Sequence, residues 1–337
     1  RLVAYAGGGH QTENNKLRLK AHLYSESDAK NQPLLQNLNT EQVDVLQQAG
    51  DNPSLMFAPS VNPETYNENK ILYRKGLRDG KEVYVFSNNP EDELYNVRFS
   101  QVGLNLGDYR LSSNTAISRI YEYVSPVNGV AQGDYAPVIR LFAPTQLQMA
   151  VVEGLFAPTD KTAIAFEGAG SKRDLNLFSE LDDSNNTGFA GKFDIRQRIL
   201  KTKSKYLDAY ATIDYIQDDF ENIERTYAIE FSRDWNLPFT TLGDQSLITG
   251  RLHYQDSTRA FVDYRFENLN FGKNYNGVRN SIISNFTINK LQTFINSSFL
   301  KTRSDTSETS FLRLNATSIY GFKKSWIGAK LSVESNN

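Results

Sequence analysis

The chain has 337 residues, and 39% of them are hydrophobic, which is enough to bury a core and excludes a disordered chain. Its 37 basic and 39 acidic residues leave a formal charge of −2, so no strong field attracts nucleic acid. The chain has no cysteine, which excludes disulfide scaffolds, thiolate metal sites and cysteine nucleophiles.

The two ends of the chain resemble neither a signal peptide nor a helical membrane anchor. No run of residues approaches the roughly 20 apolar positions that a membrane-spanning helix needs. The sequence opens on the strand-like run 2–6 and closes on the strand-like run 327–333. We therefore expect a fragment of a longer protein.

Residues 1–95 form a first region of short strands and loops with one helix. Asn39 is a typical N-cap with Gln42 three residues later, and Gly50 is a typical helix stop. This pattern predicts a helix of about ten residues. The runs 71–74 and 82–86 flank Asp79-Gly80, a pair that favours the tight turn of a β-hairpin.

Residues 96–185 form a second region, rich in turns. The tripeptide Gly-Asp-Tyr occurs twice, ending at Tyr109 and at Tyr135, each time beside a β-rich run. Glycine permits a turn and aspartate caps it through the backbone, so the first interpretation is a pair of similar turns. The alternative is that Tyr109 and Tyr135 contact a carbohydrate ligand.

Residues 186–337 form a third region, in which polar and apolar residues alternate with a period of two. Within positions 206 to 215, Leu, Ala, Ala, Ile and Tyr lie on one face, and Tyr, Asp, Tyr, Thr and Asp alternate with them on the other. The same pattern recurs around residues 248–254, 260–267, 312–320 and 327–333. Between two of these runs, residues 301–309 read as a polar loop. The region therefore predicts an antiparallel meander, closed into a barrel or left as a large open sheet.

The residues offer little evidence of catalysis. The three histidines, His10, His22 and His253, have no neighbours at metal-ligand spacing, and a Gly-x-Ser-x-Gly nucleophile turn is absent from the sequence. The three glycines at 7–9 lead into a strand rather than into the helix that a phosphate cradle needs. We therefore expect a protein without enzymatic activity.

One loop has the spacing of calcium ligands. Asp183, Asn185 and Thr187 occupy alternate positions before Gly188, and Asp194 stands where such a loop places its last carboxylate. Calcium prefers oxygen ligands at alternate positions with a glycine at the bend. A plain turn rich in Asn and Asp is the alternative, because flanking helices are not predicted. Calcium is the one cofactor that the sequence suggests.

The stretch from residue 95 to residue 190 resembles a group of large outer-membrane-associated proteins of Bacteroidota. The resemblance rests on the two Gly-Asp-Tyr turns, on the run Tyr-Glu-Tyr-Val at 121–124 and on the run Arg-Asp-Leu-Asn-Leu-Phe-Ser at 173–179; a further similar run is 230–236. In texture the chain is also similar to the barrel of the type IX secretion translocon. The resemblance implies an all-β architecture and a location, and it transfers no active site.

These observations converge on two functional hypotheses. The first is a structural or transport component of the bacterial outer membrane or cell envelope, whose extended β-sheet serves as a membrane wall or as a surface for envelope partner proteins. The second is a secreted β-sandwich module that binds glycans with the help of calcium. In both cases the fold class is all-β with one short helix near the N-terminus.

Overall fold

The computed structural model describes residues 1–30, 36–114, 119–238, 243–257 and 259–336. They form two compact units, each assembled from separate stretches of the chain. The first unit comprises residues 1–2, 27–146 and 174–183, and the second comprises residues 3–26, 147–173 and 184–337. These units do not follow the divisions expected at residues 95 and 185, because the first hairpin of the chain joins the large sheet by pairing its second strand with the strand at 146–159.

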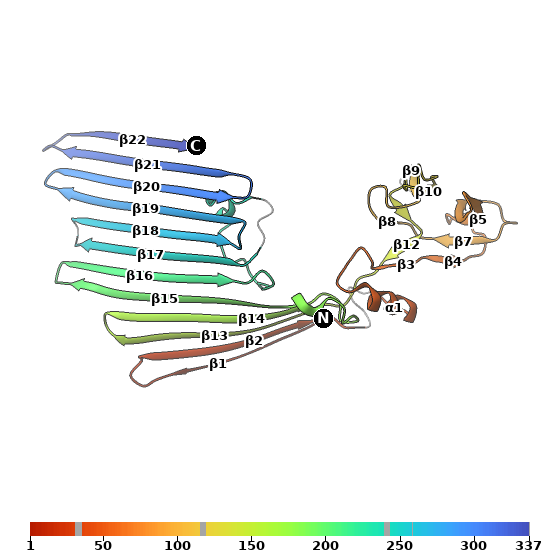
Figure 1. Cartoon of the computed structure of the whole chain (residues 1–337), viewed down its shortest axis with the longest axis horizontal. Helices are drawn as coiled ribbons and strands as arrows, with labels where there is room; N and C mark the ends of the chain where they lie inside the picture. Colours follow the sequence, from red (N-terminus) through yellow and green to blue (C-terminus); the bar gives the residue numbers. More distant parts are fainter. Residues whose placement is uncertain (31–35, 115–118, 239–242, 258, 337) are drawn as a thin grey trace. The chain divides into compact units, whose positions relative to one another are not determined.

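The second unit is one antiparallel sheet, shown in Figure 1 with its strands in chain order. Its strands are β1 (Leu2–Gln11), β2 (Leu17–Ser27), β13 (Gln146–Thr159), β14 (Thr162–Asp174), β15 (Thr187–Lys201), β16 (Lys205–Ile216), β17 (Gln245–Asp256), β18 (Ala260–Phe271), β19 (Tyr275–Ile288), β20 (Leu291–Ser304), β21 (Glu308–Gly321) and β22 (Trp326–Asn336). Across the described residues the sheet is open, with β1 and β22 at its edges. The predicted meander is confirmed in its open-sheet form.

The strands are longer than the sequence pattern indicates at one hairpin. The polar run 301–309 was expected to be a loop, but β20 and β21 continue through it, and Thr302 pairs with Thr309. Only 305–307 separate the two strands. Polar residues occupy strand positions here because the pairing continues past the end of the apolar stretch.

Strand register divides the side chains of this sheet between two faces. Asp208 lies opposite His253, and the next residue, Ala209, lies opposite Leu252, so directly paired residues share a face. We call the side that carries Asp208 the polar face and the side that carries Leu252 the apolar face. Charged members of the polar face include Glu167, Lys192, Asp194, Arg196, Arg198, Asp208, Asp214, Arg251, Asp263, Arg265, Glu267, Arg279, Arg313 and Glu334.

Within the described residues, the first unit contains three small sheets and one α-helix, which contacts the strand at 57–59. Its elements are α1 (Thr40–Ala49), β3 (Phe57–Pro59), β4 (Val61–Pro63), β5 (Tyr73–Arg78), β6 (Lys81–Phe86), β7 (Leu94–Val97), β8 (Ser100–Gln101), β9 (Tyr109–Asn114), β10 (Arg119–Tyr123), β11 (Tyr135–Ala136) and β12 (Val138–Arg140). The predicted hairpin is confirmed as β5 and β6, with Asp79 and Gly80 both at positive φ. Neither helix of the described chain, α1 or α2 (Phe231–Asp234), is long and apolar enough to span a bilayer.

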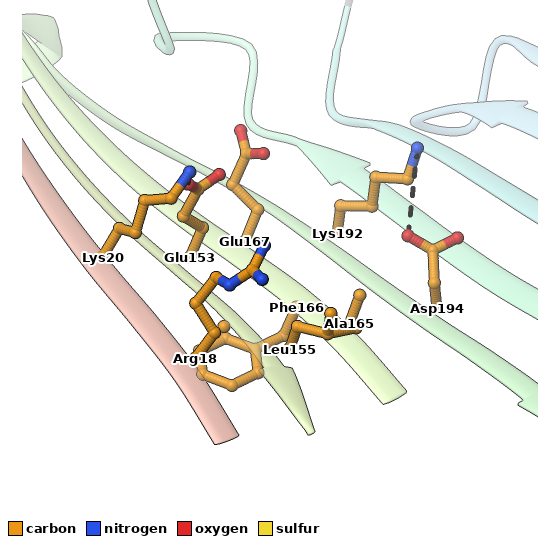
Figure 2. A pocket seen from close by; sticks show the side chains of 10 residues that line it. Arg18, Lys20, Glu153, Leu155, Ala165, Phe166, Glu167, Lys192 and Asp194 are labelled. Atoms are coloured by element: carbon orange, nitrogen blue, oxygen red, sulfur yellow. Dashed lines mark ion pairs between the residues drawn. The ribbon is translucent and has the colours of Figure 1, made fainter. Parts of the chain in front are cut away.

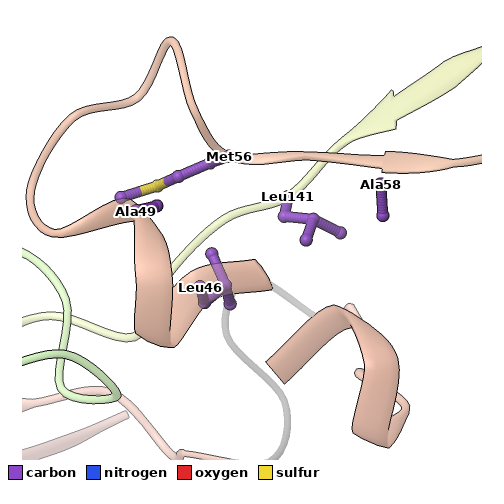
Figure 3. Packing of buried hydrophobic residues seen from close by; sticks show 5 residues of the cluster. All are labelled: Leu46, Ala49, Met56, Ala58 and Leu141. Carbon is purple, nitrogen blue, oxygen red and sulfur yellow. The ribbon is translucent and has the colours of Figure 1, made fainter. Parts of the chain in front are cut away.

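The predicted helix is also confirmed, and its two ends are held in different ways. At the N-terminus, the Asn39 side chain accepts from the Gln42 amide while the Gln42 side chain accepts from the Asn39 amide. At the C-terminus, the buried Asn176 donates to the carbonyls of Leu46 at 2.7 Å and Gly50 at 2.6 Å. Figure 3 shows Leu46 on this helix close to Ala49, Met56 and Leu141, and these buried residues form the core beside it.

Candidate functional site

The polar face of the large sheet carries a series of ion pairs across neighbouring strands. Asp208 on β16 is almost fully buried and receives Arg198 at 2.6 and 2.7 Å and Arg196 at 3.0 Å, both from β15. The bulge in β15 between 198 and 200 accompanies this arrangement, in which two guanidinium groups share one carboxylate. Bidentate arginine pairs of this kind hold a fixed geometry.

Two further pairs continue the series toward β19. Asp263 on β18 receives Arg251 at 2.8 and 2.9 Å and the Nδ1 of His253 at 2.8 Å, both from β17. Glu267 on β18 receives Arg279 of β19 at 2.8 and 3.0 Å. His253 thus lies on the polar face, where it contacts Asp263. Each of these carboxylates is therefore matched by at least one cation on the adjacent strand.

A cavity of ≈ 330 Å³ lies on the polar face where β2, β13, β14 and β15 run side by side. Figure 2 shows its lining, with Lys20 and Glu153 close together and Lys192 facing Asp194. Lys20 lies 2.6 Å from Glu153, and Lys192 lies 4.0 Å from Asp194 and 3.8 Å from Asp214. Charges of both signs converge here, a lining that suits polar or zwitterionic solutes better than apolar ones.

The segment 217–238, which joins β16 toward β17, lies across one end of the polar face; we call it the strap. Its Trp235 is 1% exposed and packs with Leu247, Leu269, Tyr275 and Leu300, which are polar-face positions of four successive strands. The Tyr275 hydroxyl donates to the Trp235 carbonyl. Under the strap, the polar-face positions of these four strands are therefore apolar and buried.

A larger cavity of ≈ 720 Å³ lies between the strap and the polar face. Strap residues Phe220 and Tyr227 line it together with Lys192 and Asp214 of the sheet. Burial raises the pKa of the Tyr227 hydroxyl to about 12, so this group is neutral at physiological pH. The cavity shares Glu167 and Lys192 with the smaller cavity, so the two are neighbours along the face.

The proposed calcium ligands occupy different kinds of structure. Asp183 and Asn185 lie in the short 3₁₀ helix η2 (Asp183–Asn185), and Thr187 begins β15. Asp194 lies further along that strand, roughly 23 Å from Thr187 at about 3.3 Å per residue, and accepts from Thr212 at 2.6 Å. Thr187 and Asp194 are thus not brought together. Within the described ranges, no group of three His, Cys, Asp or Glu side chains is arranged to hold a metal.

The two tyrosines considered as sugar contacts belong to paired turns. Gly107 and Gly133 exchange backbone hydrogen bonds at 3.0 and 2.9 Å, so the two Gly-Asp-Tyr motifs lie against each other. Tyr109 is 3% exposed, and its hydroxyl accepts from the Tyr84 amide at 2.8 Å. Tyr135 is partly buried and packs on Tyr121. The geometry supports a structural role for both rings, and their contact with a glycan stays a prediction.

Sequence reasoning located the polar face but missed the strap. Alternation revealed the charges of β16 to β18, whereas the partners of Asp208 follow only from the register of β15. Trp235 was noted only as part of a similar run at 230–236, and its burial was not expected. A tryptophan within a long polar connection was the available signal. Neither a scan of protein-family models nor a search of curated proteins found a match.

Proposed function

We propose that the chain is a non-enzymatic structural component of a bacterial outer membrane, in which its large sheet forms part of a β-barrel wall. The apolar face would contact lipid, and the polar face would line a water-filled interior. One observation carries this proposal: large apolar side chains are solvent-exposed along one face, while the opposite face carries the ion-paired carboxylates Asp208, Asp263 and Glu267. The bacterial location follows the resemblance of residues 95–190.

The apolar face is unusual for a surface in water. Its exposed side chains belong to many strands, and examples are Phe193 at 44%, Ile213 at 49%, Leu252 at 46% and Phe299 at 43% exposure. Monomeric soluble proteins rarely present contiguous apolar areas beyond a few hundred Å². Lipid chains match this face because outer-membrane strands alternate apolar-out and polar-in.

The apolar band has a boundary that fits a membrane interface. On β20 it runs from Leu291 to Phe299, roughly 26 Å at about 3.3 Å per residue, and on β21 from Leu312 to Tyr320. Outer-membrane barrels have a band of about 25 Å. Beyond the band, the same face carries ion pairs of Glu308 with Lys301 at 2.7 Å and with Arg303 at 3.4 Å. These charges would lie at the level of the lipid headgroups.

A wall in lipid cannot keep open edges, because unpaired backbone groups cannot be hydrated there. The proposal therefore requires that β1 and β22 pair with further strands, supplied by a longer chain or by another copy. In the described chain, both edge strands have their side chains largely exposed.

The test uses single-cysteine variants, which are clean because the chain has no cysteine. Ile248→Cys places a fluorophore on the apolar face, and Thr249→Cys, the matched control, places it on the polar face of the same strand. In phosphatidylcholine and phosphatidylglycerol vesicles, a doxyl-labelled lipid should quench the first label several-fold more than the second. Collisional quenching by iodide in water should show the reverse order.

Two results would contradict the proposal. Equal quenching at both positions would mean that the sheet does not separate lipid from water. If the doxyl-labelled lipid quenches neither label, and the chain purifies alone as a stable species without detergent, then protein rather than lipid covers the apolar face.

A further inference from the structure

The strap crosses most of the sheet on its polar side. At one end, the Glu221 amide donates to the Ser171 hydroxyl of β14 at 2.9 Å, and the Glu221 carboxylate lies 2.6 Å from Arg173. At the other end, the Asn236 side chain donates to Thr309 of β21 at 3.2 Å. The strap is therefore fixed to strands from β14 to β21, all at the same end of the sheet.

The sheet is shaped to receive this segment. A Cβ atom at Gly188 would lie 2.2 Å from the Phe220 backbone, and one at Gly277 would lie 3.0 Å from the Trp235 ring. The Arg279 guanidinium lies 4.3 Å from the Trp235 ring centroid while it pairs with Glu267. The strap thus packs closely where the sheet has glycine, and an arginine held by a sheet carboxylate supports its tryptophan.

We propose that the strap is an internal constriction, which narrows the polar interior at one end and limits the size of the solutes that pass. This inference rests on the proposed function, because only a closed wall has an interior. If the polar face lines that interior, a segment packed on the same face must lie inside it. The cavity between strap and sheet, with Lys192, Asp214 and Tyr227 in its lining, is then part of the route left for small polar solutes.

The first experiment blocks the route by adding bulk to the strap, and the unlabelled Asn236→Cys chain is the reference because this variant also removes the hydrogen bond to Thr309. Asn236→Cys, labelled with a 5-kDa polyethylene glycol maleimide, attaches a bulky chain to the strap, and Lys203→Cys attaches it at the β15–β16 turn, outside the strap. Swelling of proteoliposomes in arabinose, a small sugar, measures the flux. We expect the label on the strap to reduce the flux at least fivefold and the label at 203 to leave it unchanged.

The second experiment loosens the strap. Trp235→Ala removes the ring packed on the sheet, and the matched control Trp326→Ala removes an exposed ring on β22. Influx of stachyose, a tetrasaccharide, should rise at least tenfold in the first variant alone. Joining Asn236→Cys to Thr309→Cys with a short bifunctional thiol reagent in the Trp235→Ala background should return the influx toward the original value.

The outcomes separate the constriction from the wall. In the chain that carries no strap substitution, equal quenching by lipid of the labels at positions 248 and 249 contradicts the proposed function itself. If the expected difference in quenching is present but the label at position 236 leaves the arabinose flux unchanged, the strap is not a constriction. The same conclusion follows if neither the chain nor its Trp235→Ala variant admits any sugar.

Discussion

At the scale of single residues, Asp208 is the carboxylate of the polar face on which two arginines converge. It is 1% exposed and pairs with two arginines from the adjacent strand. The carboxylate separates two guanidinium groups, of which Arg198 is mostly buried, that would otherwise repel each other without a counter-ion.

Replacement of this carboxylate should therefore be costly. Asp208→Asn should lower the free energy of unfolding by about 2–3 kcal/mol, less than for a fully buried pair because Arg196 reaches water. Urea unfolding followed by tryptophan fluorescence measures the change. Glu308→Gln, which removes exposed ion pairs, is the control and should leave the unfolding midpoint nearly unchanged. Equal effects of both variants would mean that burial does not matter here.

In the first unit, Asp51 is a residue whose charge opposes folding. Partial burial raises the pKa of its carboxyl, and the nearby carboxylates Asp174, Asp182 and Asp183 raise it further. Because the pKa in the folded state lies above the ordinary value of 3.8, the folded protein binds this proton more tightly than the unfolded chain does. The associated stability is present at low pH and is lost as the pH rises through the folded pKa.

Asp51→Asn should therefore stabilise the first unit at pH 7 by up to about 1 kcal/mol, a modest gain because solvent screens the repulsion. The gain should disappear below about pH 4 and shrink in 1 M salt. Thermal unfolding at pH 4 and pH 7 measures it, with Asp44→Asn on the exposed side of α1 as the control. A gain that is equal at both pH values would contradict this explanation.

At the scale of elements, Asn176 joins α1 to a segment more than a hundred residues later. Its amide satisfies two carbonyls at the helix end, and Ser179 satisfies a third, that of Gln47, at 2.9 Å. Asn176→Ala would leave the two carbonyls buried and unpaired, so we expect a loss of about 2–3 kcal/mol. Limited proteolysis near residue 50 measures it, and the exposed Asn88→Ala should have no effect. Unchanged proteolysis of Asn176→Ala would show that water replaces the amide.

The paired Gly-Asp-Tyr turns depend on the absence of a side chain. A Cβ at Gly107 would lie 2.3 Å from the Tyr135 backbone, and a Cβ at Gly133 would lie 2.3 Å from that of Tyr109. Gly107→Ala should therefore destabilise the first unit by about 3 kcal/mol or more, because backbone cannot move aside as a side chain can. Calorimetry measures the loss. Gly168→Ala in β14, where a Cβ meets open space, is the control and should unfold like the original chain.

Some elements were predictable because their signals are local. Asn39 with Gln42 predicts the helix start, and Asp79-Gly80 predicts the hairpin, since each pattern specifies its own backbone geometry. The pairing of Gly107 with Gly133 and the cap from Asn176 were not predictable, because each joins distant segments. The strap was missed for the same reason: Trp235 carries no periodic signal, and its site is formed by several strands.

At the scale of the whole molecule, the two faces should respond oppositely to charge. Ile248→Arg places a charge against lipid and should lower the stability of the sheet in a bilayer by about 2–4 kcal/mol if the position is near the midplane. Thr249→Arg on the polar face should cost under about 1 kcal/mol. Urea titration of folded protein in vesicles, read by heat-modifiable gel mobility, compares the two. A larger loss for Thr249→Arg would reverse the assignment of the faces.

The two exposed edge strands of the sheet, β1 and β22, also affect how molecules of this chain associate. Each of β1 and β22 presents an unfilled row of amide donors and carbonyl acceptors in the described structure, next to apolar side chains such as Tyr5 and Ile327. Two released molecules can satisfy these rows by joining rim to rim, and the product has the same free rims as its parts. Growth of this kind does not end by itself. A concentrated preparation of this chain alone should therefore form edge-to-edge oligomers of no fixed size, which light scattering can measure.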